Sequence, residues 1–425
     1  MNNPEISDIV LLIGRSFFIT IIAIMLIRPI AFKIGLTDRP CSRKRHKGEI
    51  PLIGGLAIYL CITYNIWIES VYSSINIAFF TAVTVIVVTG LIDDFKNLNF
   101  KTRLVTEIFA ALIMVYGGEV QITNLGDLLG FGDIELGVFS TLFTVFAIVG
   151  GINAFNMIDG IDGLAGSTAL IIFFLLSSLC IILNCGTYSL QFAFILASST
   201  AAFLLFNFPI PGRKRALVFL GDTGSMLLGF TICWLVIAVT QGENKIISPV
   251  TILWIIGAPL LDTTSIIIRR MRKGRSPFAP DREHFHHILP VAGYGKYATI
   301  FIILSFSVLL AAIGLAGDLL FNAPDWLMFY LFIGLFAIYN WSMSHSWKMV
   351  KLARYLRIRK KDRRRKIDRR RISKSPLPFT DRRERRSSTD RRHQATGGDL
   401  EVFQKQDREP NPVDKENQAL KADDE

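Results

Sequence analysis

Eleven long apolar runs constrain the fold of this chain more than any other feature of its sequence. Each run has about 17–25 mainly apolar residues, the length that a helix needs to cross the hydrocarbon core of a bilayer. The chain is 51% hydrophobic and only 19% charged, which excludes an ordinary soluble protein. The runs lie near residues 8–30, 51–69, 75–92, 104–120, 137–155, 164–183, 187–207, 224–240, 247–268, 298–317 and 325–345. The sequence therefore predicts an all-α fold, a polytopic membrane bundle of about 11 transmembrane helices.

Basic residues are divided unequally between the two sets of alternating loops. One set has clusters of Lys and Arg within residues 33–47, 96–103, 213–215 and 269–296, whereas the opposite set has only Lys245. Because cytoplasmic loops carry the excess of Lys and Arg, the first set is predicted to be cytoplasmic. This places the N-terminus in the periplasm and the C-terminus in the cytoplasm. The net charge of +12 then reflects topology, and no specific nucleic-acid partner is expected.

The chain divides near residue 350. Residues 1–350 contain every apolar run and form the predicted transmembrane domain, and residues 351–425 form a cytoplasmic tail. The tail is rich in Arg and repeats the triplet Asp-Arg-Arg irregularly, at residues 362, 368, 381 and 390. Its low apolar content predicts disorder. Its Arg clusters favour contact with anionic lipid at the inner leaflet.

The five cysteines do not have the spacing of a metal site. Most of them lie inside or beside apolar runs, where small thiols pack well. We interpret them as packing residues. They are Cys41, Cys61, Cys180, Cys185 and Cys233.

Polar motifs gather at the predicted cytoplasmic face. They are Asp93-Asp94, the string Asn153–Gly166 with Asn or Asp at every third position as far as Asp162, Gly221-Asp222-Thr-Gly, the motif His284-Phe-His286-His287, and the basic loop 38–47. Ionisable groups at a membrane boundary are expensive and so indicate function. Carboxylates and amides beside Arg, Lys and His can hold a hard cation and phosphate oxygens together. We therefore expect one site for a divalent ion and a phosphorylated ligand.

Other interpretations of the same motifs are open at this point. Asp222 or Thr223, before an apolar run, fits a helix cap, and residues 43–47 fit a lipid-headgroup patch. The histidines suggest zinc, but no second Cys or His group lies in the predicted cytoplasmic loops. A transporter for an anionic metabolite would need similar groups, yet it would show polar groups near mid-span and an internal repeat, and we find neither. A lipid-binding scaffold would have no use for the whole set.

Taken in order along the chain, the motifs resemble those of the polyprenyl-phosphate N-acetylhexosamine-1-phosphate transferase family. The resemblance covers residues 8–345 and also rests on Asp38-Arg-Pro40, Arg43-Lys-Arg-His46 and Pro51-Leu-Ile-Gly-Gly55. It implies transfer of a sugar 1-phosphate from a UDP-sugar to undecaprenyl phosphate, with release of UMP. The site would face the cytoplasm in the bacterial inner membrane.

Two details of the motifs indicate the sugar. The Asp-x-Pro and Arg-Lys-Arg-His segments, and His-Phe-His-His in place of three consecutive histidines, resemble the family members that use UDP-N-acetylglucosamine. Such members act at the first membrane step of O-antigen or enterobacterial common antigen synthesis. Another UDP-N-acetylhexosamine, or UDP-N-acetylmuramoyl-pentapeptide, is the alternative donor.

The resemblance also implies roles for individual residues. The metal ligands would be Asp222 and Asn156, holding Mg²⁺, with Mn²⁺ left open. The catalytic residues would be Asp93, Asp94 and Asp159, of which the paired aspartates position the acceptor phosphate. The substrate-binding residues would be Asp162, Asn153, Arg103, Lys44, His46, Arg282, His284, His286 and His287. A homodimer through lipid-facing helices is a further expectation.

Overall fold

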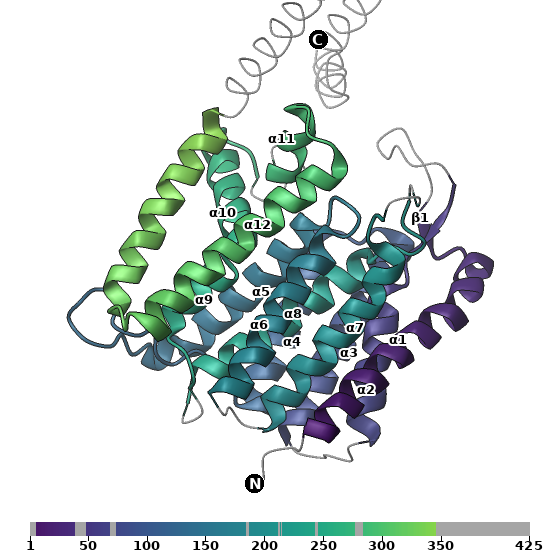
Figure 1. Ribbon diagram of the computed structural model, residues 1–425, viewed down its shortest axis with the longest axis horizontal. Helices are drawn as coiled ribbons and strands as arrows, with labels where there is room; N and C mark the ends of the chain where they lie inside the picture. The colour runs from purple at the N-terminus through teal and green to yellow at the C-terminus, as the bar shows by residue number, and fades with distance from the viewer. Residues whose placement is uncertain are drawn as a thin grey trace, which may run out of the picture. The chain divides into compact units, whose positions relative to one another are not determined.

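The computed structural model of the chain is a bundle of long helices, shown in Figure 1. It describes residues 6–38, 48–68, 74–183, 187–210, 213, 215–242, 245–276 and 284–345. The labelled helices are α1 (Ile6–Ile34), α2 (Gly54–Ile68), α3 (Ser74–Lys96), α4 (Phe100–Gly118), α5 (Ser140–Ile158), α6 (Leu164–Ile182), α7 (Thr187–Asn207), α8 (Gly221–Thr240), α9 (Pro249–Ile255), α10 (Gly257–Arg272), α11 (Phe285–Val291) and α12 (Lys296–Leu315). A further helix, Asp325–His345, follows them.

Three short elements complete the fold. Strands β1 (Thr37–Asp38) and β2 (Ile50–Pro51) pair antiparallel. A 3₁₀ turn, η1 (Gly137–Phe139), leads into α5, and a π-helical turn, η2 (Ala316–Leu320), extends α12.

Eight of the described helices are long and apolar enough to cross a membrane, and a ninth span results if the bent pair α9 and α10 is counted as one. This confirms the predicted all-α, polytopic membrane fold. All eleven predicted runs fall on helices. However, α2, with 15 residues, and α4 are not among the eight. The count of eleven and the sides of the two termini stay predictions.

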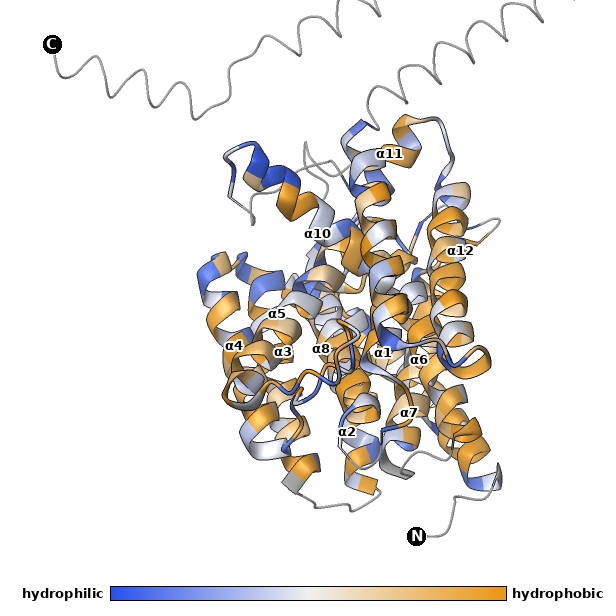
Figure 2. Ribbon diagram, turned by 90° about the vertical axis from the view of Figure 1, so that its left-hand side faces the viewer, coloured by the Kyte–Doolittle hydropathy of each residue, from blue (hydrophilic) through white to orange (hydrophobic). Residues whose placement is uncertain are grey.

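The surface of the bundle is apolar along the length of the helices. Figure 2 shows apolar residues along the helices and hydrophilic residues at the end of the bundle that carries α10 and the start of α4. Large side chains such as Phe109, Phe146 and Phe301 are more than half exposed. In a soluble protein such a surface would be a liability, whereas in a bilayer it contacts lipid.

Helix α8 is the centre of the bundle, and almost all of its residues are buried. It packs against α2, α3 and α5. Two glycines allow backbone-to-backbone contact at its start. A Cβ on Gly55 of α2 would lie 2.3 Å from the Gly224 backbone, and one on Gly90 of α3 would lie 2.4 Å from Cα of Thr223. Because these glycines have no side chains, the backbones of α2 and α3 pack directly on the first turn of α8. This close packing fixes the position of the α8 start.

The predicted span 247–268 is not one straight helix. Helices α9 and α10 bend by 81° at their junction. Pro259 lies in the first turn of α10 and has no N–H to continue the α9 hydrogen-bond ladder. After the bend, α10 is held by the helix Asp325–His345, since Ser265 Oγ donates to Asn340 Oδ1 at 3.0 Å and Arg269 Nη1 donates to the Met343 carbonyl at 3.2 Å.

The interpretation of the cysteines as packing residues is confirmed for Cys61, Cys180 and Cys233, which are all buried in the core. Cys61 and Cys233 are free and buried. Cys180, near the end of α6, is disulfide-bonded. Cys41 and Cys185 lie outside the described residues.

Candidate active site

The start of α8 is built by residues from three distant parts of the chain. The amides of Gly54 and Gly55 donate to the carbonyls of Phe219 and Leu220 at 3.0 and 3.1 Å. Gly221 then turns the chain with φ +76°, and a Cβ there would come within 2.6 Å of Asp94 Oδ2. Only glycine adopts this backbone without strain. Asp222 is thereby placed in the first turn of α8.

Asp94 anchors this helix start. Its carboxylate accepts hydrogen bonds from the Asp222 backbone N–H at 2.8 Å, the Thr223 backbone N–H at 3.2 Å and the Thr223 hydroxyl at 2.6 Å. The first N–H groups of a helix have no partner within the helix, so a carboxylate here satisfies them and complements the helix dipole. The cap that the sequence left open for Asp222 or Thr223 is therefore supplied by Asp94, from α3.

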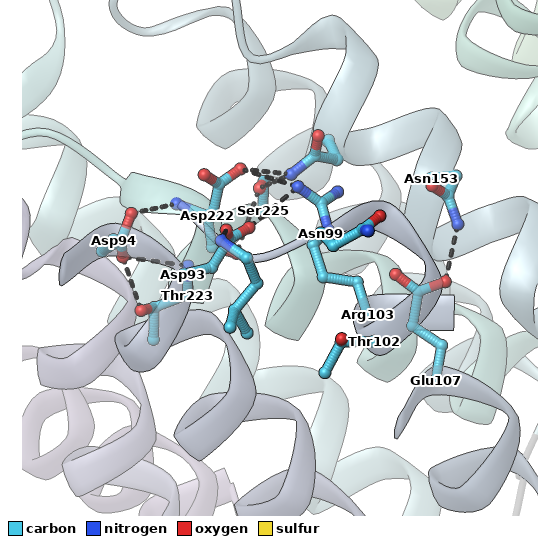
Figure 3. Close-up of polar contacts among 12 residues, drawn as sticks. Asp93, Asp94, Asn99, Thr102, Arg103, Glu107, Asn153, Asp222, Thr223 and Ser225 are labelled. Carbon is cyan, nitrogen blue, oxygen red and sulfur yellow. Dashed lines mark hydrogen bonds and ion pairs between the residues drawn. The ribbon is translucent and has the colours of Figure 1, made fainter. Parts of the chain in front are cut away.

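Asp93 points to a different partner. It accepts from the Leu98 backbone N–H at 2.6 Å and from Arg103 Nη1 at 2.8 Å. The same Arg103 nitrogen lies 3.9 Å from Asp222 Oδ1. Arg103 thus stands between the two carboxylates, as Figure 3 shows. The Asp222 side chain is 39% exposed, against 4% for Asp93. Of these two, Asp222 is the carboxylate that an ion or ligand can reach.

Asn156 of α5 completes this group. Its Nδ2 donates to Asp222 Oδ1 at 2.6 Å and to Ser225 Oγ at 3.1 Å. Asn156 is the one side chain that hydrogen-bonds the Asp222 carboxylate within the described residues. A carboxylate has about four acceptor positions, so room remains for a hard cation. To ligate the same cation, Asn156 would have to turn its amide oxygen toward it. Exposed oxygen donors of this kind fit Mg²⁺ or Mn²⁺.

Asp159 lies just beyond α5 and is half-buried. Burial, and then the negative charges of Asp222, Asp162 and Asp94, raise the pKa of Asp159 to about 8. Its carboxyl is therefore mainly protonated at pH 7 when no cation is bound. The electrostatic interactions with Asp222 and Asp94 place this predicted residue at the same site.

Asp162 forms an ion pair with Lys296, whose Nζ lies 2.5 Å from Asp162 Oδ2. Lys296 is the first residue of α12. The adjacent loop is fixed by Asn207, whose side chain accepts from the Gly163 N–H at 2.6 Å and donates to the Val218 carbonyl at 2.9 Å. Sequence reasoning treated Lys296 only as a topological charge, because a partner 134 residues away leaves no local signal.

Asn153 does not contact the Asp222 group. Its Nδ2 donates to Glu107 Oε2 at 2.7 Å, to one side of the cluster in Figure 3. Glu107 is almost completely buried, and its Oε1 has no hydrogen-bond partner within the described residues. A buried carboxylate oxygen in this state is expensive. The sequence did not single out Glu107, which is the one acidic residue of α4.

The histidine motif meets the Asn153–Gly166 string directly. His286 is 2% exposed and packs on Gly160, where a Cβ would lie 2.1 Å from His286 Nε2. Burial, and then the nearby His287 and His284, lower the pKa of His286 to about 3. His286 is therefore neutral at pH 7, and it can serve a phosphate only as a neutral N–H donor. The convergence that the sequence predicted for these two motifs is present in the structure.

Three predicted substrate-binding residues, Lys44, His46 and Arg282, lie outside the described residues. The described residues of the candidate site are Asp93, Asp94, Arg103, Asn156, Asp159, Asp162, Asp222, His284, His286 and His287, with Asn153 beside them, and their roles stay predictions.

The sequence of the chain is similar to those of known proteins. Residues 76–240 match the family model described as glycosyl transferase family 4. The chain is 36% identical to an undecaprenyl-phosphate alpha-N-acetylglucosaminyl 1-phosphate transferase of Salmonella typhi over 338 residues, which are 80% of this chain and 92% of the relative. It is 36% identical to that of Escherichia coli K12 over 339 residues, with the same shares.

A third relative, of the same name, comes from Haemophilus influenzae. It is 37% identical over 347 residues, covering 80% of this chain and 96% of the relative. At this identity and coverage, the chain belongs to the glycosyl transferase family 4 membrane enzymes that include these undecaprenyl-phosphate alpha-N-acetylglucosaminyl 1-phosphate transferases.

Proposed function

We propose that the protein transfers N-acetylglucosamine 1-phosphate from UDP-N-acetylglucosamine to undecaprenyl phosphate and releases UMP. The names of the relatives support the donor sugar and the lipid acceptor. The observation that carries the proposal is the exposed Asp222 carboxylate at the start of α8, with Asn156 on one side and Arg103 on the other. This arrangement suits a pyrophosphate and a cation, and it is formed by residues from the predicted motifs.

The reaction joins two anions and expels a third. A phosphate oxygen of the acceptor attacks the β-phosphorus of the donor, and the bond from that phosphorus to the bridging oxygen breaks. UMP leaves with that oxygen, and the new bond gives a lipid-linked pyrophosphate sugar. A phosphate monoester is largely dianionic at pH 7, since its second pKa is about 6. Alignment and charge neutralisation therefore contribute more than a general base.

Asp222 and Asn156 would hold Mg²⁺ or Mn²⁺. The cation would neutralise charge on the pyrophosphate and on the departing UMP. Arg103 would contact phosphate oxygens next to it, and Asp93 would hold the Arg103 guanidinium in place through their 2.8 Å contact. Asp94 would act mainly by fixing the start of α8. Both paired aspartates would therefore be positioning residues, Asp93 for Arg103 and Asp94 for the start of α8.

The donor would lie over the Asp159 loop. Asp162 would recognise the nucleoside, with Lys296 sharing its charge until the donor binds. Asp159, mainly protonated, would shape the pocket without adding a full negative charge beside the pyrophosphate. His286 and His287 would contact the sugar phosphate, and His284 would support them. Lys44, His46 and Arg282 are further candidates, outside the described residues.

The orientation follows from the basic loops. We place the site at the cytoplasmic face of a bacterial inner membrane, where a soluble UDP-sugar and a lipid phosphate meet. The disulfide-bonded Cys180 supports this orientation, because it lies at the end of α6 that the topology assigns to the periplasm, where disulfides persist. The tail 351–425 would contact anionic lipid, and a homodimer would form through lipid-facing helices.

A sister reaction with another UDP-N-acetylhexosamine, or with UDP-N-acetylmuramoyl-pentapeptide, is the alternative function. The deciding experiment measures UMP released by the purified protein in detergent with undecaprenyl phosphate, Mg²⁺ and one UDP-sugar at a time. We expect release with UDP-N-acetylglucosamine that requires both the lipid and the metal. Release only from another donor would change the substrate and the pathway, and no release from folded protein would refute a transferase.

The same assay tests Asp222. Asp222→Asn should reduce turnover about 100-fold or more, as loss of an electrostatic catalytic group does. Asp133→Asn is the matched control, because Asp133 is also exposed but contacts Asn124 in the loop between α4 and α5. Near-normal, metal-dependent activity of Asp222→Asn would remove Asp222 from the site.

A further inference from the structure

A second buried polar cluster includes the first histidine of the motif, and no predicted role accounts for its central residue. Its centre is Asp262, a residue of α10 that is 6% exposed. One Asp262 oxygen, Oδ2, lies 3.0 Å from His284 Nδ1. The other, Oδ1, accepts from the Phe285 backbone N–H at 3.1 Å and from the Tyr339 hydroxyl at 3.0 Å. Asp262 therefore joins α10, the start of α11 and the helix Asp325–His345.

These contacts restrict the histidine motif at its first residue. His284 stands at the N-terminal cap of α11, and the Phe285 N–H is one of the helix-start donors that lack a helical partner. Asp262 satisfies that donor and faces the His284 ring at the same time. A carboxylate beside Nδ1 favours the tautomer with its proton on that nitrogen, and it fixes the ring plane. The bend between α9 and α10 brings Asp262 to this place.

The orientation of His284 is transmitted to its neighbours. The rings of His284 and His286 are stacked, with centroids 5.2 Å apart and an interplanar angle of 20°. The centroid of the His287 ring lies 4.2 Å from the centroid of the His286 ring. His286 in turn packs on Gly160, next to Asp159. A rotation of His284 would therefore displace the rings that face the Asp159 loop, because the buried stack has little room to absorb it.

One possible ligand atom from each of Asp262, His284 and His286 lies within 4.8 Å of the other two, which is close enough to suggest a metal site. The hydrogen bonds argue against it. Three donors already occupy the two Asp262 oxygens, and a cation would displace the His284 contact that orders the motif. The cluster has the form of a carboxylate that orients a histidine, which is a common arrangement behind functional histidines.

We propose that Asp262 is a positioning residue for the transferase reaction. Through its contact with His284 it sets the ring orientation of the histidine motif, and hence the binding of the donor diphosphate. The inference rests on the proposed function. Asp262 itself touches neither substrate, so its effect on catalysis passes through His284.

The test is a double-variant cycle in the UMP-release assay with UDP-N-acetylglucosamine. Asp262→Asn keeps the size of the side chain but loses its charge and one acceptor oxygen. It should lower kcat/KM for the UDP-sugar about 10- to 100-fold, the range expected for loss of a hydrogen bond to a charged group, and leave the KM for undecaprenyl phosphate unchanged. In a His284→Gln background the same substitution should cause no further loss, because Asp262 acts through His284.

Asp318→Asn is the matched control. Asp318 also secures the start of a helix, since it accepts from the Ser248 N–H at 3.0 Å and from the Thr251 hydroxyl at 2.7 Å at the start of α9, but it contacts no residue of the motif. It should lower the melting temperature and leave kcat/KM unchanged. If Asp262→Asn does not fold, Asp262→Glu, which keeps the charge and shifts it by one methylene, enters the same cycle with the same expectations.

Each outcome decides the proposal. Normal kcat/KM in Asp262→Asn, or losses that multiply in the double variant, would overturn it, and so would an equal loss in Asp318→Asn. Wild-type protein that releases no UMP would instead refute the proposed function. A loss confined to the donor and absent in the His284→Gln background would establish Asp262 as a positioning residue.

Discussion

Thr223 donates two hydrogen bonds to one oxygen of Asp94, from its backbone N–H at 3.2 Å and from its hydroxyl at 2.6 Å. The pair joins α8 to α3 at the point where the site is built. Thr223 is completely buried, so its hydroxyl is not in contact with solvent.

Removal of the Thr223 hydroxyl should therefore loosen the start of α8. Thr223→Val keeps the shape of the side chain but removes one donor from Asp94, a loss of about 1–3 kcal/mol for a buried group. We expect a lower melting temperature in detergent and slower UMP release. Thr223→Ser keeps the hydroxyl and should stay close to wild type. Equal behaviour of the Val and Ser variants would show that the hydroxyl contributes nothing to the site.

Asp162 and Lys296 can be separated by substituting each in turn. Asp162→Ala should raise the KM for the UDP-sugar with a smaller effect on kcat, because the residue is proposed to recognise the nucleoside. Lys296→Ala breaks the same ion pair from the other side. Since both side chains are partly exposed, the pair contributes little, about 0–1 kcal/mol. Steady-state kinetics should show a large rise in KM only for Asp162→Ala, and equal effects would make the ion pair the cause.

Asp159 should make the stability of the protein depend on pH. Burial and the neighbouring aspartates raise the pKa of Asp159 from 3.8 to about 8. Between these values the unfolded carboxyl is ionised and the folded one is protonated, so folding takes up a proton. This contribution to stability is complete below the unfolded pKa and is lost as pH rises through about 8.

The measurement compares wild type with Asp159→Asn, which cannot ionise. Melting temperatures are recorded from pH 5 to 9 in buffer without divalent ions. As pH rises, the melting temperature of the wild type should fall relative to that of the variant. Above about pH 8 the difference between the two melting temperatures should become constant. A difference that is independent of pH would mean that the pKa of Asp159 is not raised.

Gly160 leaves no room for a side chain. A Cβ at this position would lie 2.1 Å from His286 Nε2, so Gly160→Ala must displace the histidine motif. We expect a strong loss of UMP release from protein that is still folded. Gly150→Ala is the control within the same region, since a Cβ there has no atom within 4 Å. If Gly160→Ala matched the control, the contact between the two motifs would be irrelevant to activity.

The sequence was sufficient for the class of fold and for the members of the main cluster. Apolar runs of spanning length report directly on helices in lipid, since a backbone in hydrocarbon has few other ways to satisfy its hydrogen bonds. The motif that contains Asp222 was recognisable because polar residues at membrane boundaries are rare. That Asn156 and Arg103 would lie beside Asp222 was expected only from the resemblance, and the structure brings them together.

What the sequence could not indicate depends on tertiary contacts. Asp262 and Glu107 are single acids in helical segments, and their partners come from distant helices. Asn153 has the same three-residue spacing as Asn156, Asp159 and Asp162, yet it hydrogen-bonds Glu107. It lies nearly one helical turn before Asn156 in α5, and so farther from the Asp222 end of that helix. The bend at α10 depends on packing that no local pattern records. The role of Asp94 as a helix anchor was likewise hidden, since adjacent aspartates look equivalent in a sequence.

The close packing of Gly55 and Gly90 on the start of α8 has a consequence for inhibitors. A compound that binds Asp222 would contact the first turn of α8, whose backbone is packed against two glycines, Gly55 and Gly90, that cannot accept a side chain. Substitutions of Gly55 or Gly90 would disturb the junction of α2, α3 and α8 and would therefore destabilise the protein itself. Resistance would have to arise at the rim of the site, in the loops that carry Asp162 and the histidines.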